Sequence, residues 1–197
     1  MKKSIALFAL PAFALLASCG GNKADVDTNT TVTNTSTITD ISTETGNGTM
    51  NQTVAVPAMT GQAFADMASG SDAYEIAAGK LAASKATTKA LKDFGTMMVK
   101  GHTHSTEKLK EAAKNASPAI VPAGVMTAEQ KANLATLESA TGADFDAAYN
   151  GQQVAAHTQA LAGIQGYAAS GDVPSLKTWA VNTAPVVQMH LEKIQGM

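Results

Sequence analysis

Four side chains of the types that bind metals or exchange protons lie on separate amphipathic segments of this 197-residue chain: Glu75, His102, His157 and His190. His102 follows Phe94 and Met98 at helical spacing, so a helix would place it on an apolar face. The nearby His104 falls on the opposite face, among lysines, and is expected to be solvated. An unpaired polar group in a core costs about 1–3 kcal/mol. His102 therefore needs a partner inside the protein.

The other three residues have similar surroundings. His157 and His190 each follow inward-facing residues at steps of three or four, as a helical stripe requires. Glu75 lies beside such a stripe, and a surface ion pair with Lys80 or Lys85 is the alternative interpretation of it. The sequence alone leaves open whether Glu75 faces the histidines.

The segments that carry these residues are predicted to be four long helices. Alanine is abundant from residue 60 onward, and β-branched runs of strand length are rare. The expected helices run from Thr60 beyond Ala82, over 87–114, over 143–169 and from Asp172, as N-cap, to about 194, with a short helix over 127–138. Gly70 is expected to kink or split the first helix, and Pro185 to bend the last or restart it one turn before His190. Helices joined by short loops pack antiparallel, so the fold class is all-α, a four-helix bundle with a short extra helix.

The first 60 residues have a different character. Met1-Lys2-Lys3 and an apolar run of about 13 residues are typical of a secretory signal. The run ends in Leu16-Ala17-Ser18-Cys19, which resembles the cleavage and lipidation site of bacterial lipoproteins; ordinary signal-peptide cleavage is the alternative. The resemblance implies that residues 1–18 are removed and that Cys19 is acylated. It also implies anchoring in the cell envelope, on the outer membrane facing the periplasm.

Residues 19–60 are expected to form a disordered tether, and residues 61–197 the folded domain. Threonine occupies 12 of positions 20–60, and Phe, Trp, Tyr and Leu are absent there, so this stretch cannot bury a core. The chain has no arginine and a formal charge of −2, which argues against a nucleic-acid partner. Its one cysteine, Cys19, excludes cysteine-based metal sites and a catalytic thiol in the domain.

Several motifs together resemble a known family. They are Glu75 to Ala82, Phe94 with Met98 to His102, Phe145 to Tyr149 with Gln153 to His157, and Pro185 with His190-Leu191. This combination is similar to a ferritin-like family of bacterial envelope proteins, commonly labelled outer membrane proteins, whose domain has no assigned function. The resemblance implies a four-helix bundle and no settled activity. The family usually has Asp immediately before the second-helix histidine, where this chain has Gly101.

Two classes of function follow from these observations. In the first, the protein is a non-catalytic, lipid-anchored envelope module with a stress-related or partner-binding role, and its buried polar residues form a network that fixes the packing. In the second, Glu75 and the three histidines bind one divalent transition metal such as Zn²⁺, Cu²⁺, Ni²⁺ or Fe²⁺, with Asp146 in support. The sequence lacks the two Glu-x-x-His pairs of diiron bundles, and no residue is assigned a catalytic role.

Overall fold

The computed structural model describes residues 59–197. The signal segment, Cys19 and the Thr-rich tether therefore lie outside the described residues. Within 59–197 the chain forms five helices and no strand, which confirms the all-α prediction. None of these described helices is both long enough and apolar enough to cross a membrane.

Four helices are long and one is short. Helix α1 spans Gly61–Lys85, α2 spans Lys89–Lys114, α3 spans Ala128–Ser139, α4 spans Gly142–Ser170 and α5 spans Pro174–Gln195. Threonine hydroxyls cap the first turns of α1, α2 and α3, accepting hydrogen bonds from backbone N–H groups three residues on. At α3 the expected capping box of Thr127 and Gln130 is complete.

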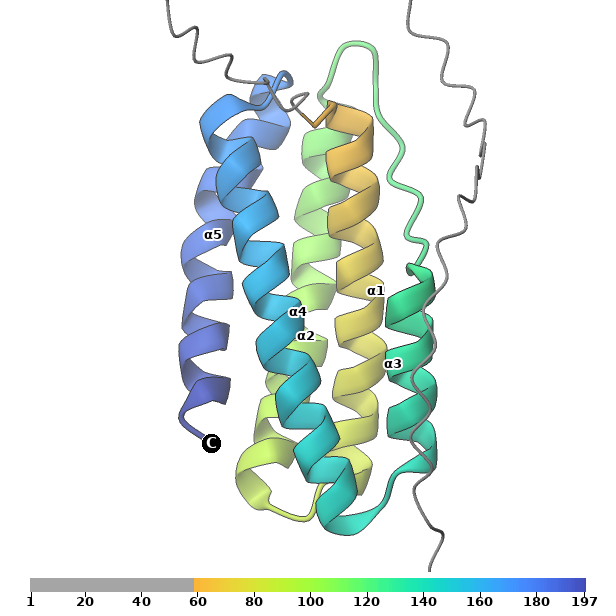
Figure 1. Cartoon of the computed structure of the whole chain (residues 1–197). Coiled ribbons are helices and arrows are strands. Elements are labelled where there is room, and N and C mark those ends of the chain that lie inside the picture. The colour runs from red at the N-terminus through yellow and green to blue at the C-terminus, as the bar shows by residue number, and fades with distance from the viewer. Residues whose placement is uncertain (1–58) are drawn as a thin grey trace, which may run out of the picture. The chain divides into compact units, whose positions relative to one another are not determined.

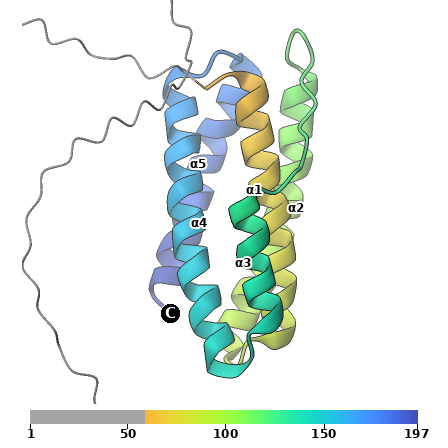
Figure 2. The ribbon, with the colours of Figure 1, turned by 45° about the vertical axis from the view of Figure 1, so that its right-hand side comes forward.

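The four long helices surround one core (Figure 1). Helix α1 packs against α2 and α4, and α5 packs against α2 and α4, so these four helices form a closed ring around the core. The short α3 lies outside this ring against α1 and α4 (Figure 2). The 115–127 connection and α3 together make one long crossover between α2 and α4.

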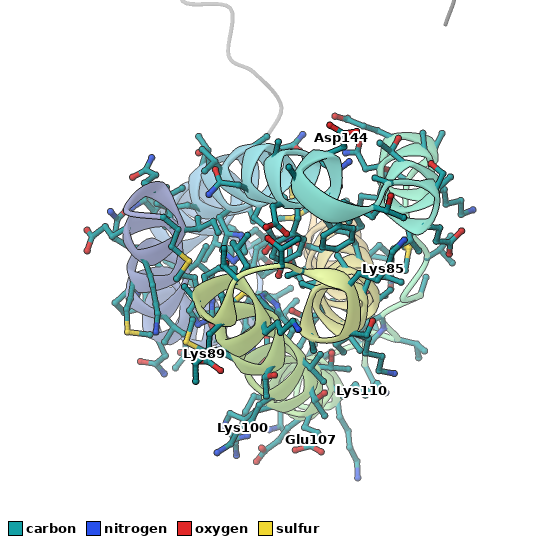
Figure 3. All side chains as sticks on the ribbon, turned by 90° about the horizontal axis from the view of Figure 1, so that it is seen from below. Lys85, Lys89, Lys100, Glu107, Lys110 and Asp144 are labelled. Atoms are coloured by element: carbon teal, nitrogen blue, oxygen red, sulfur yellow. The ribbon has the colours of Figure 1, made fainter. Side chains whose placement is uncertain are left out.

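Two aromatic layers fill the core at different heights. In one layer Phe64 stacks on Tyr167, with ring centroids 3.9 Å apart, and meets the edge of Trp179. In the other, Phe94 packs edge-on against Tyr149 at 6.3 Å. The described charged side chains point mostly outward, as Lys100, Glu107 and Lys110 do in Figure 3. The buried polar residues lie between the two aromatic layers.

Three local expectations differ from the structure. Helix α1 continues through Gly70, where a side chain would lie 2.5 Å from the carbonyl oxygen of Val125. Gly70 therefore allows the crossover loop to lie close to α1, and it does not split the helix. Asp172 does not cap α5; its carboxylate accepts a hydrogen bond from the Tyr167 hydroxyl at 2.8 Å, and the N-cap is Val173. Helix α5 does not restart at Pro185, which lies inside one continuous helix.

A close approach between α1 and α2 predicts a sharp effect of one methyl group. A Cβ added at Gly95 would lie 2.6 Å from the Gly79 carbonyl oxygen and 2.9 Å from the backbone nitrogen of Ala83. Because backbone atoms cannot rotate away, we expect Gly95→Ala to lower the free energy of unfolding by about 1–3 kcal/mol. Gly151→Ala on α4 is the control, since nothing lies within 4 Å of its added Cβ. There the better helix propensity of alanine should stabilise the protein by about 0.5–1 kcal/mol in urea unfolding.

Candidate metal centre

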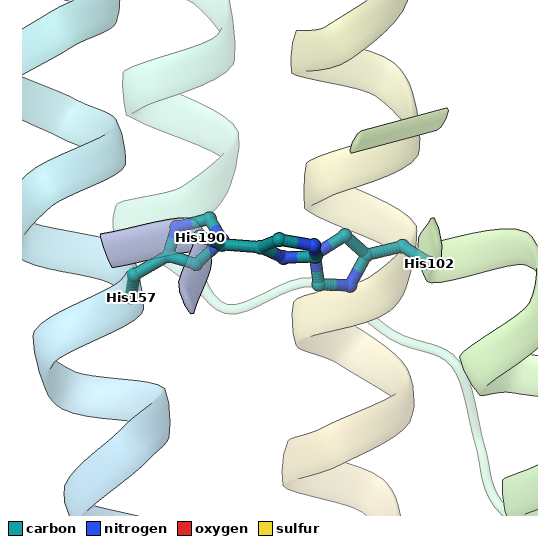
Figure 4. Close-up of side chains that lie close together, drawn as sticks. All are labelled: His102, His157 and His190. Atoms are coloured by element: carbon teal, nitrogen blue, oxygen red, sulfur yellow. The ribbon is translucent and has the colours of Figure 1, made fainter. Parts of the chain in front are cut away.

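Three histidines from three helices meet between the aromatic layers. His102 lies on α2, His157 on α4 and His190 on α5, and their exposed fractions are 7%, 2% and 4%. The ring centroids are 5.6–5.8 Å apart in all three pairs. One ring nitrogen from each histidine lies within 4.8 Å of the others (Figure 4). The helical stripes therefore bring the three predicted histidines to the same height in the bundle.

Hydrogen bonds fix the tautomers of two of these rings. The Nδ1 of His102 is 2.8 Å from a carboxylate oxygen of Asp72, and the Nδ1 of His157 is 2.9 Å from the backbone carbonyl oxygen of Gln153. A carbonyl oxygen and an ionised carboxylate only accept hydrogen bonds, so each Nδ1 carries the proton and donates it. In a neutral ring the lone pair is then on Nε2. Neither Nε2 has a hydrogen-bond partner, and the Nδ1 of His190 is likewise buried without one.

Asp72 is a site residue that the sequence analysis missed. It lies on α1, is 4% exposed, and accepts hydrogen bonds from both His102 and the Thr106 hydroxyl, the latter at 3.1 Å. Asp72 comes four residues after Ala68 and three before Glu75, and both spacings place it on the inward face of α1. This spacing could have identified it from the sequence. Asp72 orients the His102 ring through its Nδ1 and leaves its Nε2 free.

Glu75 lies beside the three histidines and is fully buried, with 1% of its surface exposed. Its Oε1 is 3.8 Å from the Nδ1 of His157, which is the ring nitrogen already bonded to Gln153. Its Oε2 has no hydrogen-bond partner in the described structure. Glu75 therefore faces the core and not Lys80 or Lys85, and it lines the same cavity as the three histidines.

Burial and mutual repulsion set the charge of this group. Burial, together with the charge of His102, lowers the pKa of His157 to about 3 and that of His190 to about 4. Burial also lowers the pKa of His102, but the hydrogen bond to Asp72 and the charge of Glu75 outweigh this, so the net shift is upward. Burial raises the pKa of Glu75 to about 7. At neutral pH, His157 and His190 are therefore neutral and offer lone pairs.

Asp146 does not support this cluster, contrary to expectation. Its carboxylate accepts hydrogen bonds from the backbone N–H, at 2.9 Å, and the hydroxyl of Thr87, at the start of α2. It shares a stripe with His157 but lies 11 residues earlier, which is about 16 Å along a helix at 1.5 Å per residue. His104 is exposed, as expected, with its ring 4.0 Å from Glu107.

The cluster has the donor chemistry of a transition-metal site. Imidazole nitrogens suit Zn²⁺, Cu²⁺, Ni²⁺ and Fe²⁺, and carboxylates or backbone carbonyls commonly hold the second nitrogen of a ligating histidine. Asp72 and the Gln153 carbonyl stand in that position here. Tetrahedral coordination with bonds of about 2.0–2.1 Å requires nitrogens about 3.3 Å apart. In the structure these nitrogens lie within 4.8 Å of one another. The three rings must therefore move closer together to bind one ion.

Comparison with known proteins identifies the family of this domain. Residues 47–197 match the family described as "Domain of unknown function (DUF4142)", which covers more than half of the chain and all five described helices. No curated protein and no solved structure matches the chain. The chain therefore belongs to the DUF4142 family.

Proposed function

We propose that the domain is a transition-metal-binding helical bundle, in which His102, His157 and His190 hold one divalent ion. The observation that carries the proposal is the convergence of one ring nitrogen from each of three buried histidines. Two of these rings, His102 and His157, have their tautomers fixed by a partner at Nδ1. Glu75 and Asp72 place negative charge next to the ion, which offsets the cost of burying it.

The alternative is a purely structural polar network in a non-catalytic module. Such a network stabilises a core when its members satisfy one another's hydrogen bonds. In this cluster each of the three histidines has one ring nitrogen that is buried without a partner. One carboxylate oxygen of Glu75, Oε2, is also buried without one. These unpaired groups favour a ligand at the centre over a closed network of side chains.

Metal content tests the proposal directly. We would purify the full chain in mild detergent without chelators and measure bound transition metals by mass spectrometry. A variant with His102, His157 and His190 all replaced by alanine is the comparison. Metal near one equivalent in the wild type, and lost in the variant, is the expected result. Equal metal content in the two proteins, or none in either after reconstitution, would leave the histidines as core residues.

The carboxylate of Asp72 is expected to strengthen metal binding without touching the metal. Asp72→Asn preserves the size of the side chain but removes the charge that holds the proton on His102 Nδ1. Loss of such an outer partner typically weakens metal affinity by about 10–100-fold, and competition with a chromogenic zinc chelator would measure it. Asp93→Asn is the matched control, because Asp93 is exposed on α2 and pairs only with Lys89. Equal affinities in the two variants would exclude this role for Asp72.

We also propose that the domain is held at the envelope by a lipid on Cys19, on the outer membrane facing the periplasm. The support is the sequence pattern around Cys19 alone. A lipoprotein cysteine carries two or three acyl chains, and more than one chain is needed for stable anchoring. Metabolic labelling with an alkyne fatty acid should mark the wild type and not Cys19→Ser, and the variant should leave the membrane fraction. Labelling of both proteins would contradict the anchor.

A further inference from the structure

The cavity at the three histidines adjoins a groove on the outside of the bundle. The cavity has a volume of about 40 Å³, which is room for about three water-sized molecules at about 10–15 Å³ each. A larger groove of about 560 Å³ lies between α2 and α5. The cavity and the groove share five lining residues: Gly101, Ser105, Trp179, Thr183 and Val186. These five residues, which lie on α2 and α5 between the groove and the site, are called the passage below.

Gly101 places no side chain in this passage. A Cβ added there would lie 3.4 Å from Cε1 and 3.8 Å from Nε2 of the His190 ring. Any longer side chain would extend over the imidazole and into the space that the cavity and the groove share. Trp179 forms another part of the wall, and its indole N–H is buried without a hydrogen-bond partner.

The protein supplies three nitrogen donors at the point of convergence. Closed structural zinc sites have four protein ligands, whereas sites with three protein ligands hold water or another small ligand in the fourth position. Glu75 Oε1 is 3.8 Å from the Nδ1 of His157, the nitrogen bonded to Gln153, and Glu75 does not belong to the group of residues whose ligand atoms converge. Three donors next to a small cavity that adjoins a surface groove match the open type.

We infer that the metal bound here keeps one open coordination position, which takes a small exogenous ligand of two or three atoms that enters between α2 and α5 past Gly101. This inference rests on the proposed function, because it requires the metal. The cavity volume limits the ligand size, and the apolar walls formed by Ile164, Val186 and Val187 favour a diatomic molecule or a linear anion over a hydrated substrate.

Azide binding to the cobalt-loaded full chain tests the inference. Co²⁺ at a histidine site absorbs visible light, and an added ligand changes the spectrum. We expect azide to shift the visible bands of the wild type in a saturable titration. The spectral change is expressed per bound cobalt, so that proteins with different cobalt contents can be compared. On this basis Gly101→Leu should weaken azide affinity by about tenfold or more, and Gly101→Ala should have a smaller effect. The control is Gly151→Leu, an exposed position on α4 with open space around it, which should behave as the wild type.

The outcomes separate the two proposals. Cobalt content is measured first for every protein, and absence of stoichiometric cobalt in the wild type overturns the proposed function and this inference with it. Bound cobalt whose spectrum does not respond to azide overturns only the open position. Equal azide affinity in the wild type, Gly101→Ala and Gly101→Leu overturns the route past Gly101.

Discussion

Zinc is expected to raise the unfolding temperature of the wild-type protein by about 10–20 °C when its free concentration is about 1,000 times the dissociation constant. Binding at that concentration adds about 4 kcal/mol to the free energy of unfolding, and each kcal/mol shifts the midpoint by a few degrees in a domain of this size. The His157→Ala variant should show no zinc-dependent shift, because it lacks one of the three converging nitrogens. Scanning calorimetry with and without zinc measures both proteins.

The zinc-dependent difference is the informative quantity, since His157→Ala also leaves a hole in the core and lowers the unfolding temperature without metal. His104→Ala is the control. It removes an exposed histidine two positions from His102 on the same helix and should retain the full zinc response. A zinc response in His157→Ala as large as that of the wild type would show that zinc binds elsewhere.

The metal-free protein is expected to lose stability as the pH falls from about 6.5 to about 4.5. Burial and the charge of His102 lower the pKa values of His157 and His190 to about 3 and about 4, so in this range both bind protons only when the chain unfolds. Burial raises the pKa of Glu75 to about 7, so Glu75 releases a proton on unfolding over the same range. Two protons are gained and one is lost, which favours the unfolded state in acid.

The expected slope from these three groups is about 1.4 kcal/mol for each pH unit, which corresponds to one net proton. His102 contributes with the opposite sign above about pH 6.5, because its pKa is raised and the folded state retains its proton longer. Urea unfolding in a chelator, from pH 4.5 to 6.5, would measure the slope. His190→Gln should lower it by about one proton. The same slope in the variant and the wild type would mean that His190 is not held neutral in the core.

Helical periodicity was sufficient to predict the four long helices and to place His102, His157 and His190 on their inward faces. It could not predict that the three rings meet, because the relative heights of the helices depend on packing such as the Gly79–Gly95 approach. The wrong prediction for Asp146 has the same cause, because Asp146 shares a helix face with His157 but lies at a different height in the bundle. A stripe gives the direction of a side chain, and only the assembled bundle gives its position along the axis.

Asp72 and Gln153 show a second limit of the sequence. Gln153 lies four residues before His157, on the same face of its helix, but its contribution to His157 comes from a backbone carbonyl, which no residue type reveals. Asp72 could have been found from its spacing to Glu75, yet its partner His102 lies on another helix. The partners that orient the rings are thus tertiary contacts between residues that are ordinary in the sequence.

Anomalous diffraction from crystals of the zinc-loaded protein tests the central claim most directly. Data collected on both sides of the zinc absorption edge would locate the ion without assumptions about its ligands. The proposal predicts one strong peak between α2, α4 and α5, about 2.0–2.1 Å from one ring nitrogen each of His102, His157 and His190. A zinc peak only at a surface site such as His104, with no density between the three rings, would contradict it.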